Sequence, residues 1–255
     1  MKSARLSAIT AAICLLGLGT VGTSFADPVD FNHWSGNGNG YTWTVSDGSW
    51  MGSDVVPSVP LSPQGLFLNG AATGNYILSG RIEVENTADN DMIGIVFGYQ
   101  GENDYYALDW KQAQQTYSDT FADEGFTLFR IDGSGADFWN HPTSAGNILY
   151  TQYGDSEGWQ ENTAYDFVLT YTDTRVAINI SDGTTTLFDQ VVNGSFAPGQ
   201  FGAYNFSQAH TRYSDFRVSA VPLPGALWLL GSGLLGLASF RRRATGRPEM
   251  GDTAM

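Results

Sequence analysis

Short runs of alternating apolar and polar residues, separated by turn signals, recur between residues 27 and 219 and constrain the fold more than any other feature. Alternation with a period of two is typical of strands that bury one face. Asp182-Gly183, placed between Ile180 and Thr184, is a strong hairpin signal. The pattern predicts an all-β domain, and its many short strands favour a two-sheet jelly-roll β-sandwich. The predicted strands cover residues 76–85, 92–99, 105–111, 125–131, 165–171, 175–180, 186–191, 199–206 and 212–218.

The N-terminal segment, residues 1–26, has the features of a secretory signal peptide. Lys2 and Arg5 precede an uncharged apolar run over residues 6–21, and small residues at 24 and 26 predict cleavage before Asp27. The only cysteine, Cys14, lies inside this segment. The exported domain is therefore expected to fold without a disulfide, and its stability must come from the core of residues 27–219.

The charge of this middle region is strongly acidic. Residues 27–219 hold 6 basic and 24 acidic side chains, a net charge of −18. Such a surface repels nucleic acid and anionic lipid, so we expect no nucleic-acid partner. The charge alone is compatible with a divalent cation and equally with a plain solvated acidic surface.

The C-terminal segment, residues 221–243, predicts one transmembrane helix. An uncharged stretch over residues 223–240 is long enough to cross ~30 Å of hydrocarbon. The arginines that follow mark the cytoplasmic side, which leaves residues 244–255 as a short cytoplasmic tail. The motif residues are Val221, Pro222, Leu223, Pro224, Arg241, Arg242 and Arg243.

This order of elements resembles the PEP-CTERM sorting signal that exosortases recognise, with Leu223 where the usual motif has glutamate. The resemblance implies processing by an exosortase-type enzyme. It further implies export in a Gram-negative bacterium, linked to extracellular polysaccharide and biofilm matrix. The extension over residues 244–255 is longer than usual for the signal. The alternative is a plain single-span membrane anchor.

Several segments of the middle region resemble the thrombospondin C-terminal domain, a lectin-like, concanavalin A-like jelly roll. The most specific are Phe-Gly-Tyr-Gln at residues 97–100 and Trp-Lys-Gln at residues 110–112, supported by Phe-Gly at 201–202 and Tyr-Ser-Asp-Phe at 213–216. The family's cysteines are not matched, no Arg-Gly-Asp triplet occurs, and the calcium-wire repeats are absent. The resemblance therefore implies the fold and a calcium site, but not animal receptor binding.

The best metal candidate is the loop that holds Asp89, Asn90 and Asp91. Calcium takes six to eight oxygen ligands, which carboxylates, amides and carbonyls supply. Two residues apart in extended chain, Asp89 and Asp91 point the same way, so they can share one Ca²⁺ ion. The alternative is an Asx-rich turn without metal. Asp109 is unusual between Leu108 and Trp110, and either faces outward or reaches a cation.

The best glycan candidate is a loop with Trp139, Asn140 and His141, because exposed aromatic rings stack on sugars. Trp139 in a packed core is the alternative. We expect no catalytic residues, since the sequence has no histidine spacing of a zinc site, no phosphate-binding loop and no Glu-x-Asp-x-x-Glu pattern of the kind used for glycoside hydrolysis on a jelly roll.

These observations predict an exported, calcium-associated, non-enzymatic adhesion or matrix protein, held by its C-terminal helix before processing and then found at the cell surface or in the matrix. Its partners would be extracellular polysaccharide or a surface protein. A carbohydrate-active enzyme or a glycan-binding lectin on the same fold is the alternative, and a matrix protein without a specific ligand is a third.

Overall fold

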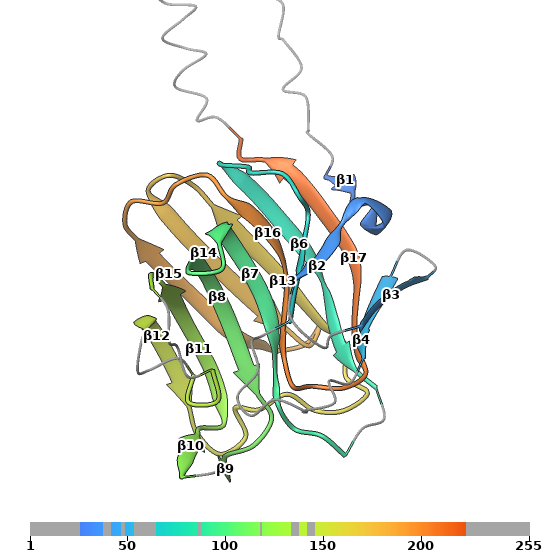
Figure 1. Ribbon diagram of the computed structural model, residues 1–255, viewed down its shortest axis with the longest axis vertical. Helices are drawn as coiled ribbons and strands as arrows, with labels where there is room; N and C mark the ends of the chain where they lie inside the picture. Colours follow the sequence, from blue (N-terminus) through green and yellow to red (C-terminus); the bar gives the residue numbers. More distant parts are fainter. Residues whose placement is uncertain are drawn as a thin grey trace, which may run out of the picture.

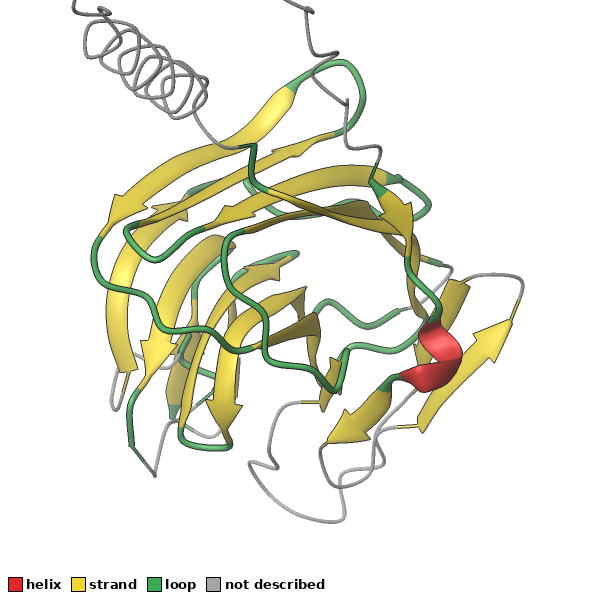
Figure 2. Ribbon diagram, turned by 90° about the horizontal axis from the view of Figure 1, so that it is seen from above, coloured by secondary structure: helices red, strands yellow, loops and turns green. Residues whose placement is uncertain are grey.

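The computed structural model describes residues 26–37, 42–46, 49–53, 65–85, 88–117, 119–133, 138–141 and 146–222. In this part of the chain, strands form two large antiparallel sheets that face each other (Figures 1 and 2). One helical turn, η1 (Phe31–His33), lies near the start of the described residues. The predicted all-β sandwich is therefore confirmed.

The first sheet has eight strands in the described residues: β15 (Thr186–Asn193), β14 (Arg175–Ser181), β13 (Tyr165–Tyr171), β6 (Tyr76–Val84), β17 (Thr211–Ala220), β4 (Ser49–Ser53) and β3 (Thr42–Ser46) in this order, with β1 (Asp27–Pro28) beside β17. The second has seven: β12 (Gly146–Tyr153), β11 (Gly125–Ile131), β8 (Asp104–Lys111), β7 (Met92–Gly101), β16 (Gln200–Phe206), β5 (Gly65–Leu68) and β2 (Ser35–Asn37). A small ribbon pairs β9 (Gln115–Tyr117) with β10 (Thr120–Ala122).

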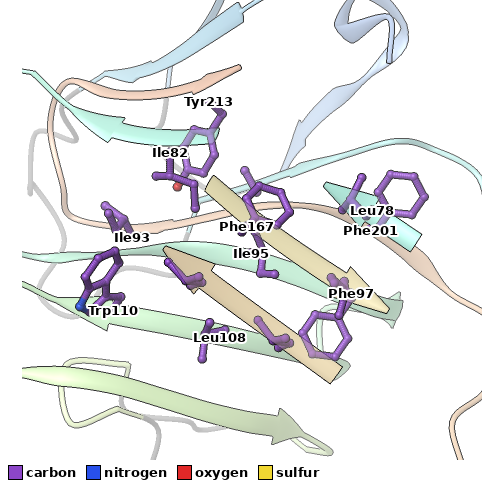
Figure 3. Close-up of a cluster of buried hydrophobic side chains, with 14 of the residues drawn as sticks. Leu78, Ile82, Ile93, Ile95, Phe97, Leu108, Trp110, Phe167, Phe201 and Tyr213 are labelled. Carbon is purple, nitrogen blue, oxygen red and sulfur yellow. The ribbon is translucent and has the colours of Figure 1, made fainter. Parts of the chain in front are cut away.

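The main core lies between the two sheets. Strand β6 alternates strictly between buried and half-buried residues, as the sequence predicts for a strand with one face inward. Figure 3 shows its Leu78 and Ile82 with Phe167 of β13, facing Ile95 of β7 and Leu108 of β8. Burial of these apolar side chains is the main favourable contribution to folding.

The seven-stranded sheet is also covered on its outer face. Strands β7 and β8 are buried almost continuously, because alternate residues enter a second apolar cluster. That cluster includes Val96, Ala107 and Phe129 from the sheet, and Trp139 from a loop that lies over it. Polar residues of β8 that face this side, Asp109 and Lys111, are therefore buried as well.

The terminal predictions fall outside what the structure describes. Residues 1–25 and 223–255, which hold most of the predicted signal peptide and the predicted membrane helix, are not among the described residues. Within residues 26–222, and excluding the gaps given above, no helix is long and apolar enough to span a membrane. The predicted domain end at residue 219 lies one residue before the end of β17 at Ala220.

Candidate functional site

Asp89, Asn90 and Asp91 lie directly before β7 and are held against the turn that joins β16 to β17. The Asp91 amide donates a 2.6 Å hydrogen bond to Gln208 Oε1, and the Ala209 amide donates to Asp89 Oδ2 at 3.3 Å. The Asn90 amide donates to Asp89 Oδ1 at 3.1 Å, which is a local Asx contact. The loop is thus ordered by contacts with a segment about 120 residues away.

The two aspartate carboxyls of this loop influence each other. Burial and, next, the neighbouring negative charge of Asp91 together raise the pKa of Asp89 to about 6. Asp91 is only 6% exposed. A partly buried pair of like charges is costly unless a cation or a shared proton accompanies it.

Lys111, at the end of β8, supplies an internal cation at this loop. Its Nζ lies 3.1 Å from Asp91 Oδ1, 3.1 Å from the Asn90 carbonyl oxygen and 3.3 Å from Gln115 Oε1. The residue is fully buried, and burial lowers its pKa, although Asp91 and then other nearby aspartates oppose that shift. With Asn90 Oδ1 at 3.4 Å as a fourth, these acceptors satisfy the three ammonium protons, which is what a buried lysine requires.

Trp139 lies over this lysine. The Lys111 Nζ is 4.5 Å from the centre of the indole ring, a cation–π geometry. The indole Nε1 donates to the Thr120 carbonyl oxygen at 3.1 Å, and the residue is 6% exposed. The open ring that we expected for a sugar platform is therefore not found at Trp139, because the ring is engaged in packing.

His141 is buried with Asp109, the aspartate that was unusual for its place in a strand. His141 Nδ1 lies 2.9 Å from Asp109 Oδ1, and Nε2 donates to the Asp123 carbonyl oxygen at 2.8 Å. Burial alone would lower the pKa of His141, but the Asp109 charge and the hydrogen bonds to Asp109 and Asp123 together raise it. The raised pKa widens the pH range in which His141 is an imidazolium, the form that pairs with the Asp109 carboxylate.

The structure joins the two loops that the sequence presented separately. Asp109 and Lys111 are two residues apart on β8 and so lie on the same, outer face of the seven-stranded sheet. Lys111 contacts the aspartate loop and Trp139, while Asp109 contacts His141. Asn140, which lies between Trp139 and His141 in the chain, is half-buried. The sequence analysis did not select Lys111 as a site residue. Its place two residues after Asp109 in a predicted strand could have indicated that both side chains lie on the same face.

One oxygen of this cluster has no partner. Asp109 Oδ2 is buried and makes no hydrogen bond in the described structure. The described residues also contain no group of three or more His, Cys, Asp or Glu side chains that is placed to hold a metal ion. Any ion at the aspartate loop would therefore need carbonyl or amide oxygens among its ligands.

Of the sorting residues, only Val221 and Pro222 are described. The Val221 amide donates to the Asn75 carbonyl oxygen at 3.1 Å, which fastens the end of the domain to the start of β6. Leu223, Pro224, Arg241, Arg242 and Arg243 lie outside the described residues.

Residues 42–221 match the sequence profile of the thrombospondin C-terminal region. The chain belongs to this family. The PEP-CTERM protein-sorting motif matches residues 220–243, directly after the thrombospondin C-terminal domain. Both resemblances seen in the sequence are confirmed.

Relatives of this thrombospondin C-terminal domain include thrombospondin-2 of Bos taurus and of Homo sapiens, each 27% identical over 195 residues. Those alignments cover 68% of this chain but 17% of either relative. Cartilage oligomeric matrix protein of Rattus norvegicus is 24% identical and aligns over 67% of this chain and 25% of its own length. The chain thus spans a small part of these animal proteins.

Two solved structures share the fold of the thrombospondin C-terminal domain. The exoplasmic/lumenal domain of VIP36, in a Ca²⁺/Man3GlcNAc-bound form, has a TM-score of 0.54 at 11% identity over 79% of this chain and 91% of that chain. The carbohydrate-binding module CBM66 of Bacillus subtilis has a TM-score of 0.51 at 14% identity over 74% of this chain and 96% of that chain. At such identities the likeness shows a lectin-like β-sandwich and nothing finer.

Proposed function

We propose that the protein is an exported, non-enzymatic adhesion or matrix protein. The observation that carries this proposal is the direct succession of a thrombospondin C-terminal domain, residues 42–221, and a PEP-CTERM motif, residues 220–243. A sorting motif at the end of a binding fold delivers that fold to the cell exterior. The C-terminal helix would hold the domain at the membrane until an exosortase-type enzyme processes it.

The proposed partner is extracellular polysaccharide or a surface protein. The net charge of −18 in residues 27–219 argues against nucleic acid and anionic lipid surfaces. A lectin role is the second candidate. It is favoured by the likeness of the fold to the carbohydrate-binding module CBM66 and to the VIP36 domain in its Ca²⁺/Man3GlcNAc-bound form.

A binding role also agrees with the state of the acidic side chains. Asp91 pairs with Lys111 and Asp109 with His141, so these buried carboxylates are engaged with structural cations. Asp104, Asp166 and Glu85 pair with arginines. These five carboxylates are therefore accounted for by ion pairs within the domain.

We further propose that calcium associates with the aspartate loop. The chemistry of the loop suits the ion, because Asp89 and Asp91 are neighbouring carboxyls and the pKa of Asp89 is raised to about 6. Asp89, Asn90 and Asp91 would hold the ion together with carbonyl oxygens. Bound calcium would relieve the repulsion between the carboxylates and stiffen the loop beside Lys111.

Localisation tests the main proposal. The full chain and a variant with alanines at residues 221–224 are expressed in a Gram-negative host that has an exosortase, and the cell fractions are compared. The natural chain should reach the surface and matrix fractions, whereas the variant should stay with the membrane. Equal distribution of both chains, or retention of both in the cytoplasm, would contradict the proposal.

Thermal unfolding tests the calcium proposal. Millimolar calcium should raise the midpoint by several degrees over a chelator, since a ligand at ~100-fold its Kd adds about 2.7 kcal/mol. The Asp89→Asn variant should lose this response, and the exposed Asp189→Asn on β15 should keep it. An unchanged midpoint of the natural chain would refute the calcium site.

A further inference from the structure

The ribbon of β9 and β10 stands apart from both sheets. In the described structure its two strands pair only with each other. An isolated two-stranded ribbon is marginal in water, so it depends on the contacts at its base. Gln115 accepts from Lys111 Nζ at 3.3 Å, the Thr120 carbonyl accepts from Trp139 Nε1 at 3.1 Å, and Ala122 is fully buried.

Two aromatic rings of this ribbon face solvent. Tyr117 is 55% exposed and Phe121 is 45% exposed. Among the described residues, the other exposed large apolar side chains are aliphatic: Ile148, Val168 and Val191. The other aromatic residues whose burial the structure describes are buried or half-buried, so one short ribbon presents the two exposed rings.

The two rings lie on opposite faces of the ribbon. Tyr117 pairs across the ribbon with Thr120, and Phe121 pairs with Thr116, so Tyr117 and Phe121 point to different sides. The Tyr117 ring packs beside Trp139, with centroids 5.6 Å apart and planes at 58°. Tyr117 is therefore the ring that packs against buried Trp139. Phe121 is exposed to a similar fraction on the other face of the ribbon.

A continuous series of contacts holds Tyr117 in place. Asp91 binds Lys111 at 3.1 Å, Lys111 lies 4.5 Å from the Trp139 ring centre, and Trp139 contacts Tyr117. The first three members are buried and the last is open. A ring that is fixed before binding loses little conformational freedom when a ligand stacks on it.

We propose that Tyr117 is the contact ring for an uncharged polysaccharide. This inference rests on the adhesive function proposed above and names the ligand class and the place of binding. A phenol ring offers an apolar face to the C–H face of a sugar and a hydroxyl to its oxygens. Asp119, Asp123 and Glu124 lie close by in sequence, and the domain carries a net charge of −18, so anionic polymers are repelled.

The position of the ribbon agrees with this role. Figure 1 shows β9 and β10 at one end of the sandwich and the end of β17, from which the chain continues into the sorting motif, at the opposite end. Strand β9, which holds Tyr117, therefore lies at the end of the sandwich opposite to the end of β17.

Affinity electrophoresis of the full chain in mild detergent tests the inference. Native gels contain hydroxyethyl cellulose or dextran as neutral polymers, or alginate as an anionic one. Tyr117→Ala should weaken retardation by a neutral polymer roughly tenfold. Phe121→Ala is the matched control, because it removes an equally exposed ring from the opposite face, and it should bind as the natural chain does.

The results separate this inference from the proposed function. Binding to a neutral polymer that Tyr117→Ala leaves unchanged, or stronger binding to alginate, overturns the role of Tyr117 but leaves an adhesive protein. If no polymer retards the natural chain while it still reaches the matrix, the inference fails and a protein partner remains. Failure of matrix localisation as well would overturn both. Unchanged thermal midpoints of the two variants exclude misfolding as the cause.

Discussion

The Lys111 ammonium and the Asp91 carboxylate form a buried ion pair, 3.1 Å apart, that joins the end of β8 to the loop before β7. The strands themselves bring these residues together, since Met92 and Lys111 are direct partners in the β7–β8 register. The pair is also the meeting point of the aspartate loop and the Trp139 loop. Its removal should therefore affect both.

The first prediction concerns the stability of this pair. Lys111→Met removes the cation and leaves Asp91 buried with an uncompensated charge, which should reduce the free energy of unfolding by about 3–5 kcal/mol. The measurement is urea denaturation at neutral pH. Arg81→Met is the control, because it breaks the Arg81–Asp166 pair, whose side chains are 42% and 50% exposed, and should cost less than about 1 kcal/mol. Equal losses in the two variants would contradict a structural role for Lys111.

The fold was predictable where strands alternate between a buried and a half-buried face, as β6 does, and where turn signals separate the apolar runs. The prediction for residues 76–85 agrees with β6, and the Asp182-Gly183 turn lies between β14 and β15 as expected. Strands β9 and β10 were missed, since three residues are too few for a periodic pattern. The site was predictable only in pieces. The burial of Trp139 and the His141–Asp109 pair depend on how a loop lies over a sheet, and local sequence carries no signal for that packing.

The second prediction concerns pH and Asp89. Because the pKa of Asp89 is raised from 3.8 to about 6 in the folded protein, the folded state binds a proton more tightly than the unfolded state does. This contribution to stability is present below about 3.8 and is lost as the pH rises through about 6. Asp89→Asn should therefore remove this fall in stability between pH 4 and 6, measured in chelator. An unchanged pH dependence would show that the folded state does not raise the pKa of Asp89.

The third prediction concerns pH and His141. Burial disfavours its charge, but Asp109 and the Asp123 carbonyl raise its pKa above the usual 6.5, despite the opposing charge of Lys111. Its contribution to stability is complete below pH 6.5 and is lost as the pH rises through the raised value. His141→Gln should cost about 2–3 kcal/mol at pH 6 and less at pH 9. The exposed His33→Gln is the control and should cost nothing measurable at either pH. A larger loss at pH 9 would reverse the proposed charge state.

The last prediction concerns the space between β7 and β8. Gly94 lies directly opposite Asp109, and a Cβ at this position would come within 1.9 Å of the Leu108 carbonyl oxygen. Backbone atoms cannot yield as a flexible side chain does, so Gly94→Ala must separate the strands where Asp109 meets His141. We expect a loss of about 2–4 kcal/mol in the free energy of unfolding. Gly101→Ala on the same strand, where no atom lies within 4 Å of the added Cβ, should change stability by less than about 0.5 kcal/mol. Because strand separation also weakens the His141–Asp109 pair, Gly94→Ala should flatten the pH dependence that His141 provides, and Gly101→Ala should not. A stable Gly94→Ala protein with an unchanged pH profile would show that β7 can shift without disturbing the pair.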